Sequence, residues 1–242
     1  MLIKDVVQGF EGKVKFVSED WGTSALAKQL GIRKYPVVFV GDALFARPEE
    51  FGGWGAKEGK YAPWRDKANQ ARFKTDLSQM VNLMLEGKRA EALNLQPKFD
   101  TNAKEVAELP NFTLTDINGK AINSTNLAGK VVVVDFWATW CGNCRPTLKF
   151  LSDLKKIHGE KVVVLALALD SEVEDIKKLT QPLNPSMNFV SASETQIAPF
   201  GVINSVPTML IFDQQGKFDS AFYGAPKDLH ENVSKSLESL LK

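Results

Sequence analysis

Two cysteines, Cys141 and Cys144, follow a long apolar run and precede an amphipathic stretch. The run at 131–140, VVVVDFWATW, is rich in β-branched and aromatic side chains, which is typical of a strand buried on both faces. After the cysteines, apolar residues recur at the spacing of a helix that we expect to end at Gly159. These residues are Leu148, Leu151, Leu154 and Ile157. The order of strand, Cys-x-x-Cys turn and helix is specific and restricts the possible folds.

Thiols at such a junction have a defined chemistry. Backbone N–H groups at the N-terminus of a helix stabilise negative charge, so Cys141 is held partly as a thiolate near neutral pH. Cys144, one helical turn later, can attack a mixed disulfide formed by Cys141 and release the substrate. We therefore expect Cys141 to attack and Cys144 to resolve.

Charge and composition exclude several kinds of protein. The chain of 242 residues has 30 Lys and Arg against 29 Asp and Glu, a net charge of +1, without the basic cluster that nucleic acid requires. Two cysteines are too few for a disulfide-stapled mini-domain, and His158 and His230 stand at no metal-ligand spacing from the thiols. We therefore expect no nucleic-acid partner, no metal and no cofactor.

The sequence predicts no transmembrane helix. Its longest apolar run covers 162–169, far short of the ~20 residues of a spanning helix. The first residues, MLIKDVVQGFEG, contain no long apolar segment and no cleavage site, so no signal peptide is visible. Export stays open, because a leader peptide can have been removed.

We expect two domains, joined by a polar, proline-bracketed linker at 98–109. The second domain, 110–242, opens with a hairpin in NFTLTDINGKAINST, where Asn-Gly supplies the positive φ angles of a two-residue turn. Ser171, three residues before Glu174, predicts a capping box at the start of a helix. The other predicted elements are a strand in KVVVLALALD, a short helix in SETQIAPFGV, two antiparallel strands in VPTMLIFDQQGKFDSAFYG and a closing helix in PKDLHENVSKSLESLLK. This alternation predicts an α/β fold.

The first domain, 1–97, shows a similar pattern in shorter form. We expect strands in KVKFVSED and on both sides of the Gly-Asp turn in YPVVFVGDALFA, and helices in SALAKQLG and around 73–85. A Gly-rich stretch between these elements carries Trp54, Tyr61 and Trp64. These aromatic residues either pack against the core or form a contact surface, and we favour the core.

The second domain resembles a known family. VVVVDFWATWCGNC and the later SVPTMLIFDQQGKF are similar to the thioredoxin superfamily. The preceding NFTLTDINGKAINSTNLAGK and the extra βα unit around 162–190 resemble its TlpA/ResA-type thiol-disulfide oxidoreductases and the related AhpC/TSA-redoxin group. The resemblance covers about residues 106–242. It implies a thioredoxin-like mixed sheet flanked by helices, and an enzyme that exchanges electrons with protein cysteines as a reductase.

The resemblance also implies roles for individual residues. Cys141 becomes an exposed nucleophile and Cys144 a buried resolving thiol. Asp135 becomes a buried carboxylate that manages the proton of Cys144, since burial raises the pKa of a carboxyl group toward the range useful for proton transfer; its alternative is a hydrogen-bonded structural role. Val206-Pro207 becomes a cis peptide that docks an extended substrate, although a proline here can also simply begin an edge strand. The implied substrate-binding residues are Trp140, Gly142, Asn143, Val206 and Pro207.

Two departures from the family pattern matter. Gly142 and Asn143 stand between the cysteines where thioredoxins carry Gly-Pro, and this pair tunes thiolate stability, so the direction of electron flow stays open. Pro146 comes earlier than the usual helix proline, and we expect it to distort the first turn through a lost bond to Gly142. A peroxidase is disfavoured, because peroxidatic relatives carry their reactive cysteine without an adjacent Cys-x-x-Cys partner.

The first domain resembles only the later part of a thioredoxin domain, with Tyr35-Pro36 at the cis-proline position. The strand and the Cys-x-x-Cys that should precede it are absent from the sequence. Either the chain is truncated, which we favour, or this domain is a partial module used for packing or partner binding. We thus expect a partial thioredoxin-like domain before the complete one.

Three functions follow from these patterns. The leading one is a thiol-disulfide oxidoreductase that acts on proteins with disulfides or thiols. It would draw on an upstream thiol electron donor, a membrane carrier in the family, and work outside the cytoplasm. The alternative is a non-catalytic binding module with a structural disulfide. Metal delivery, the third, lacks ligands in the sequence.

Overall fold

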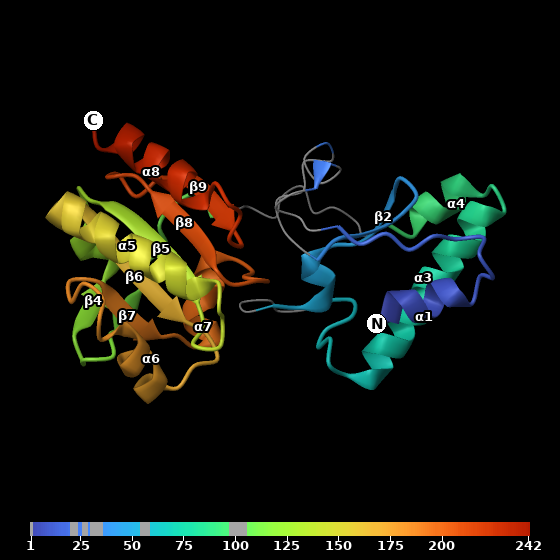
Figure 1. Cartoon of the computed structure of the whole chain (residues 1–242), viewed down its shortest axis with the longest axis horizontal. Coiled ribbons are helices and arrows are strands. Elements are labelled where there is room, and N and C mark those ends of the chain that lie inside the picture. Colours follow the sequence, from blue (N-terminus) through green and yellow to red (C-terminus); the bar gives the residue numbers. More distant parts are fainter. Residues whose placement is uncertain (1, 20–23, 26–28, 30–35, 54–58, 97–105) are drawn as a thin grey trace. The chain divides into compact units, whose positions relative to one another are not determined.

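The computed structural model describes residues 2–19, 24–25, 29, 36–53, 59–96 and 106–242. The chain divides into two compact units, unit 1 at Met1–Ala103 and unit 2 at Lys104–Lys242. Figure 1 colours them from blue to green and from green to red. Of the described helices, none combines the length and the apolar character needed to cross a lipid bilayer.

Unit 1 combines a β-hairpin with a long helix. Its described elements are α1 (Leu2–Gln8), β1 (Val38–Val40), β2 (Ala43–Ala46), the 3₁₀ helix η1 (Pro48–Phe51), α3 (Lys67–Leu85) and α4 (Arg89–Asn94). β1 and β2 pair antiparallel around the Gly-Asp turn, which confirms the predicted hairpin. α3 confirms the helix predicted from apolar spacing. It buries Phe73, Leu77, Met80 and Val81.

The aromatic residues of unit 1 form a core cluster. Tyr61 is fully buried and its ring lies edge-on to Phe73 at 5.1 Å between centroids. Trp64 lies edge-on to Phe51 at 4.9 Å. The Tyr61 hydroxyl donates to the Asp76 carboxylate at 3.0 Å, which satisfies its polar end. The core interpretation is therefore confirmed for Tyr61 and Trp64, whereas Trp54 lies outside the described residues.

Of the other predictions for unit 1, one is wrong and two lie largely outside the described residues. The strand predicted in KVKFVSED is wrong over its described part, since residues 13–19 form no strand. A strand needs a hydrogen-bonded neighbour, and no described residue pairs with this segment. Most of the helix predicted in SALAKQLG lies outside the described residues. So does Tyr35, and with it the Tyr35-Pro36 bond.

Unit 2 is built around a mixed sheet with the strand order β7-β6-β5-β8-β9. β5, β6 and β7 run parallel, and β8 and β9 are antiparallel to their neighbours. This is the predicted thioredoxin-like arrangement. The elements are β3 (Thr113–Thr115), β4 (Ala121–Asn123), η2 (Ser124–Leu127), β5 (Val131–Trp137), α5 (Cys144–His158), η3 (Gly159–Lys161), β6 (Val162–Ala168), α6 (Val173–Thr180), β7 (Asn188–Ser191), α7 (Glu194–Ile197), η4 (Ala198–Phe200), β8 (Thr208–Phe212), β9 (Phe218–Tyr223) and α8 (Leu229–Leu240).

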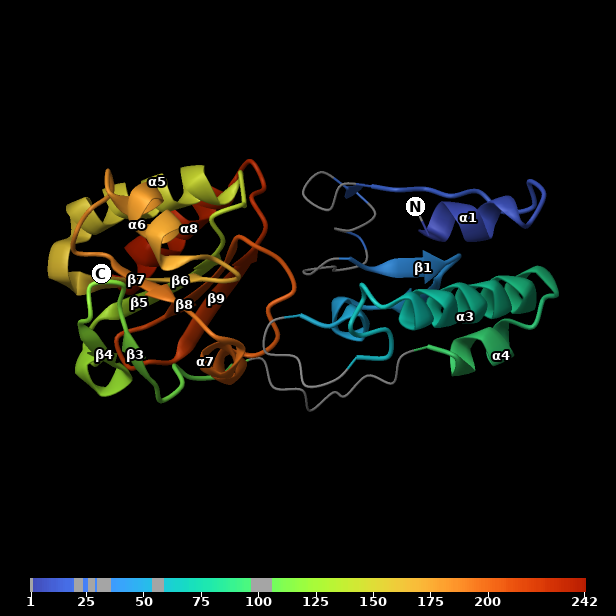
Figure 2. The ribbon, with the colours of Figure 1, turned by 90° about the horizontal axis from the view of Figure 1, so that it is seen from below.

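Helices and a hairpin cover the two faces of this sheet. Figure 2 shows α5, α6 and α8 along one face, and the β3–β4 hairpin with α7 along the other. β5 and β6 are buried along their whole length for this reason. Alternate residues of β5 face opposite layers: Val133 belongs to the core that contains α5 and α8, whereas Phe136 contacts Phe200 beyond α7.

Four details of unit 2 differ from expectation. The hairpin exists, but Thr115 pairs with Ala121, so its turn is longer than two residues. The edge strand β7 was not predicted, because it is short and half polar. Ile157 is 74% exposed, whereas the other apolar residues of its spacing are buried. At the start of unit 2, Leu109 donates its N–H to Gly216, so this end of the predicted linker is bound to the β8–β9 turn.

Candidate redox site

The cysteine loop and a cis-proline meet at one end of the sheet. β5 ends at Trp137 and α5 begins at Cys144, so the residues between them form the loop that carries Cys141. β8 runs antiparallel to β5 and pairs Thr208 with Phe136, which brings its first residues to the same end. The Val206–Pro207 bond is cis, as the resemblance implies.

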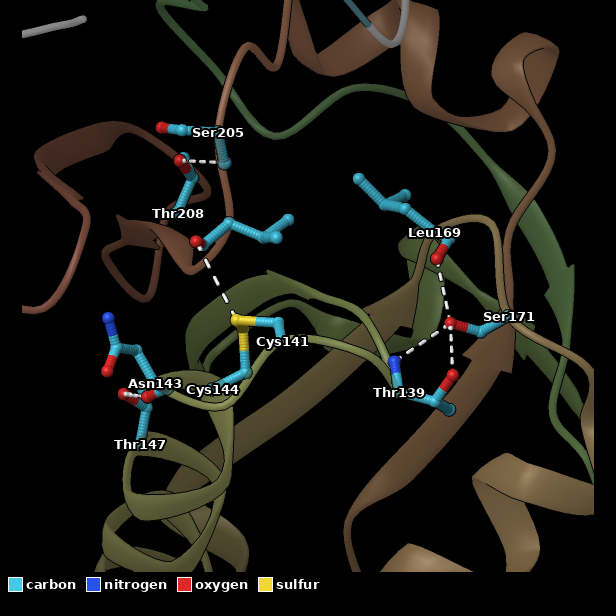
Figure 3. Close-up of a disulfide and its surroundings, with 10 residues drawn as sticks. Thr139, Cys141, Asn143, Cys144, Thr147, Leu169, Ser171, Ser205 and Thr208 are labelled. Carbon is cyan, nitrogen blue, oxygen red and sulfur yellow. Dashed lines mark hydrogen bonds between the residues drawn. A yellow bond between two sulfur atoms is a disulfide. The ribbon is translucent and has the colours of Figure 1, made fainter.

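A contact joins these two segments across 65 residues of sequence. The Cys141 Sγ atom lies 3.7 Å from the carbonyl oxygen of Val206. Thr208 fixes the proline loop by donating from Oγ1 to the Ser205 carbonyl at 2.8 Å (Figure 3). The carbonyl of Val206 therefore lines the sulfur side of the site.

The two cysteines form a disulfide, with an S–S distance of 2.08 Å. Cys144 is fully buried, in accord with the burial that the resemblance implies. Cys141 is only 7% exposed, so the expectation of an exposed nucleophile is wrong for this oxidised state. The physical reason is ring closure: the bond directs the Cys141 sulfur toward Cys144, and the Val206 carbonyl lies on its other side.

The helix start fits the cysteine turn without distortion. Asn143 is the N-cap of α5, and the N–H of Cys144 donates to the Cys141 carbonyl at 3.2 Å. Pro146 is thus the third residue of the helix. N–H groups in the first turn have no intrahelical partner, so the proline removes none of the helix's own bonds. The expected distortion through a lost bond to Gly142 is wrong for this reason.

The surface beside the disulfide is open. Trp140 is 60% exposed, and Gly142 and Asn143 are also exposed. A Cβ atom added at Gly142 would meet nothing within 4 Å. Val206 is half-buried and Pro207 is buried. The structure therefore brings all of the predicted substrate-binding residues to the region around the sulfurs.

Asp135 lies on the central strand, fully buried. It is paired in register with Ala166 of β6 and Met209 of β8, and strand alternation directs it to the face covered by α5. Neither carboxyl oxygen has a hydrogen-bond partner among the described residues. Burial raises the pKa of Asp135 to about 8, because the charged form loses its hydration. The alternative of a hydrogen-bonded structural group finds no partner in the part of the chain that the structure describes.

Sequence reasoning missed one group of residues at the site. Ser171 Oγ accepts hydrogen bonds from the N–H of Thr139 at 3.0 Å and from its hydroxyl at 3.2 Å. The predicted capping role of Ser171 is wrong, because the N-cap of α6 is Glu172. Ser171 and Thr139 are 32 residues apart, and no sequence pattern connects their hydroxyl groups.

Known proteins resemble the chain over about half of its length. Residues 129–218 match the family model described as thioredoxin-like. The thiol-disulfide oxidoreductase ResA of Bacillus thuringiensis (strain Al Hakam) is 31% identical over 138 residues, which cover 56% of this chain and 75% of that protein. ResA of Bacillus cereus (strain ATCC 10987 / NRS 248) is 32% identical over 138 residues, with shares of 56% and 75%.

Solved structures agree on the fold. A thioredoxin-family thiol:disulfide interchange protein from Chlorobium tepidum TLS superposes with a TM-score of 0.52 at 21% identity. The match covers 57% of this chain and 99% of that one. At this identity the likeness concerns the fold alone.

Proposed function

The chain belongs to the ResA-like thiol-disulfide oxidoreductases of the thioredoxin superfamily, and from this premise we propose that Cys141 and Cys144 are its redox-active pair and that it reduces disulfides in other proteins. One observation carries the proposal. The disulfide lies at the start of α5, and its Cys141 sulfur is 3.7 Å from a backbone carbonyl of the cis-proline loop. The proposed nucleophile, Cys141, therefore lies next to a backbone segment, at Val206, along which a substrate chain could bind.

The proposed cycle begins from the reduced enzyme. The Cys141 thiolate attacks one sulfur of a substrate disulfide, whose S–S bond breaks and releases the first substrate thiolate. The Cys144 thiolate then attacks the Cys141 sulfur of the mixed disulfide. The second substrate thiolate leaves, and two electrons have passed from the enzyme to the substrate. In the proposed cycle the Cys141–Cys144 disulfide is the oxidised product.

Attack by Cys144 requires loss of its proton in a buried position, and we propose Asp135 as the acceptor. Its carboxyl is buried on the face of β5 that α5 covers, and α5 begins with Cys144. Near neutral pH only the ionised minority of this carboxyl can accept a proton, and its pKa of about 8 is well matched to a thiol, whose ordinary pKa is about 8.5. Proton transfer between them would therefore cost little free energy in either direction.

The substrate edge follows from exposure and backbone geometry. We propose that an extended substrate segment lies along Val206 and Pro207, with Trp140, Gly142 and Asn143 on the other side of the sulfurs. Gly142 has no side chain, and the space beside it leaves room for the substrate residues next to the reacting cysteine. Trp140 offers a large, 60% exposed ring for apolar contact.

The proposal extends to partners and location. The substrates are proteins with disulfides, and an upstream thiol donor, membrane-bound as in the family, returns the two electrons. We place the enzyme outside the cytoplasm on the same resemblance. The reductase direction rests on this resemblance too.

A redox titration tests the proposal. Oxidised protein is equilibrated with glutathione or dithiothreitol buffers, and thiols are counted by the mass shift after alkylation. We expect a reversible midpoint between roughly −120 and −270 mV, toward the negative end for a reductase. A midpoint near −120 mV would contradict the direction.

The low exposure of Cys141 favours one other function, a binding module with a structural disulfide. In that case the pair would resist reduction until well below about −300 mV. Such a result would contradict the proposed enzyme cycle.

A further inference from the structure

We propose that the Ser171 hydroxyl is a positioning group for the dithiol. It fixes Thr139, and through it the loop that carries Cys141, and so sets the equilibrium between dithiol and disulfide. The inference rests on the function proposed for Cys141 and Cys144.

Every hydrogen-bonding position of this hydroxyl is used (Figure 3). Ser171 Oγ donates its proton to the Leu169 carbonyl at 2.7 Å. It accepts from the Thr139 N–H at 3.0 Å and from the Thr139 hydroxyl at 3.2 Å. A serine hydroxyl has one proton and two lone pairs. Because the proton is committed to Leu169, both lone pairs are held toward Thr139.

Leu169 and Ser171 are themselves held by the strands of the sheet. The N–H of Leu169 donates to the Trp137 carbonyl at 2.8 Å, just beyond the β5–β6 ladder, and both residues are fully buried. The Ser191 hydroxyl, at the end of β7, donates to the Ser171 carbonyl at 3.4 Å. Ser171 is therefore fixed relative to three parallel strands, and it transmits this position to Thr139.

The loop beyond Thr139 is exposed at Trp140, Gly142 and Asn143, and the Cys141 N–H donates to the carbonyl of Ala138, the residue before Thr139, at 3.1 Å. Cys141 follows Thr139 by two residues, whereas Cys144 is held by the first turn of α5. Release of Thr139 would widen the range of positions that the Cys141 sulfur samples, while Cys144 stays in place. The effective concentration of one thiol at the other would fall, and disulfide formation depends on that concentration.

The experiment measures this equilibrium. The reaction is protein dithiol plus glutathione disulfide giving protein disulfide plus two glutathione thiols, so two electrons and two protons leave the protein. For Ser171→Ala we expect the equilibrium constant of disulfide formation to fall threefold to tenfold. This change makes the midpoint potential about 15 to 30 mV less negative.

Ser152→Ala is the matched control. Ser152 Oγ also accepts a backbone N–H from 32 residues away, that of Asn184 at 2.9 Å, but on a later turn of α5. We expect this variant to lower the melting temperature and leave the midpoint unchanged. Ser171→Thr keeps the hydroxyl and should retain the wild-type midpoint. Thr139→Val keeps the N–H bond alone and should shift the midpoint in the same direction as Ser171→Ala, by less.

The outcomes separate the inference from the proposed function. If wild-type protein titrates reversibly and Ser171→Ala has the wild-type midpoint, the inference is overturned and the proposed function stands. An equal shift in Ser152→Ala also overturns it, because any lost hydroxyl would then act alike. If Ser171→Ala does not fold, Thr139→Val decides: a shift supports the inference and an unchanged midpoint overturns it. A wild-type pair that cannot be reduced overturns both.

Discussion

The two units of this chain are stabilised in different ways. In unit 2, a five-stranded sheet with two wholly buried central strands is covered on both faces. In unit 1, the described sheet is only the β1–β2 hairpin, and large rings supply much of the core. These rings belong to Phe45, Phe51, Tyr61, Trp64 and Phe73.

Both units contain a cis X-Pro bond, Ala62–Pro63 in unit 1 and Val206–Pro207 in unit 2. Both cysteines, however, belong to unit 2, where β5 ends beside the second of these bonds. Because both cysteines belong to unit 2, we expect the proposed chemistry to depend on this unit alone.

The largest effect should come from the cysteines. Cys141→Ser removes the sulfur that we propose as the nucleophile, and we expect complete loss of turnover in a disulfide-reduction assay. Cys144→Ser should still attack a substrate disulfide through Cys141 but should accumulate mixed disulfides with substrate, visible by non-reducing electrophoresis. Full multiple-turnover activity in Cys144→Ser would contradict the resolving role.

Removal of one ring should strongly destabilise unit 1. Phe73 contacts the rings of Phe45, Tyr61 and Trp64, and Phe73→Ala leaves a cavity among them. We expect the free energy of unfolding of unit 1 to fall by about 3 to 5 kcal/mol, measured by hydrogen exchange in α3. Leu85→Ala, at a 47% exposed position of the same helix, is the control and should change little. A changed midpoint potential in Phe73→Ala would contradict the expectation that the redox chemistry depends on unit 2 alone.

Asp135 should make the stability of unit 2 depend on pH. The native carboxyl keeps its proton up to a pKa of about 8, whereas the unfolded chain loses it near 3.8. Between these values unfolding releases a proton, so the free energy of unfolding falls as pH rises, by at most about 1.4 kcal/mol per pH unit. Asp135→Asn cannot titrate. In urea unfolding of the oxidised protein, its free energy of unfolding should therefore rise relative to that of wild type from about pH 4 to about pH 8. Parallel pH profiles would mean that the carboxyl is charged in the native state.

The smallest effect on stability should come from the exposed ring of the site. Trp140→Ala should change the free energy of unfolding by no more than about 0.5 kcal/mol, as is usual for exposed positions. We expect it to raise KM for a protein substrate severalfold and to leave the midpoint potential unchanged. Ile157→Ala, at a 74% exposed position of α5, is the control for loss of surface apolar area. An unchanged KM in Trp140→Ala would remove this residue from the substrate edge.

The central part of unit 2 was predictable because its signals are local. β5 and β6 are continuous apolar runs of strand length, and the cysteines stand between such a run and a helical spacing. The cis state of Val206–Pro207 came from family resemblance, since the residues themselves leave both isomers open.

What could not be predicted depends on partners distant in sequence. The strand expected in KVKFVSED has the right composition but no described neighbour to pair with. Ser171 matched a local capping pattern, yet its hydroxyl bonds to Thr139 instead. The burial of Cys141 follows from ring closure and from Val206 beside it, and neither is written in the spacing of the cysteines.

Because β8 pairs with β5 but follows it late in the sequence, the parts of the site are synthesised at different times. A chain is made from its N-terminus, so the cysteines leave the ribosome well before the segment 65 residues later that lines their sulfur side. Until β8 docks, β5 lacks one of its two neighbours, and its exposed edge can pair with another chain. The nascent chain therefore carries its thiols before the Val206 carbonyl can reach their sulfur, and completion of this site depends on a late, long-range contact.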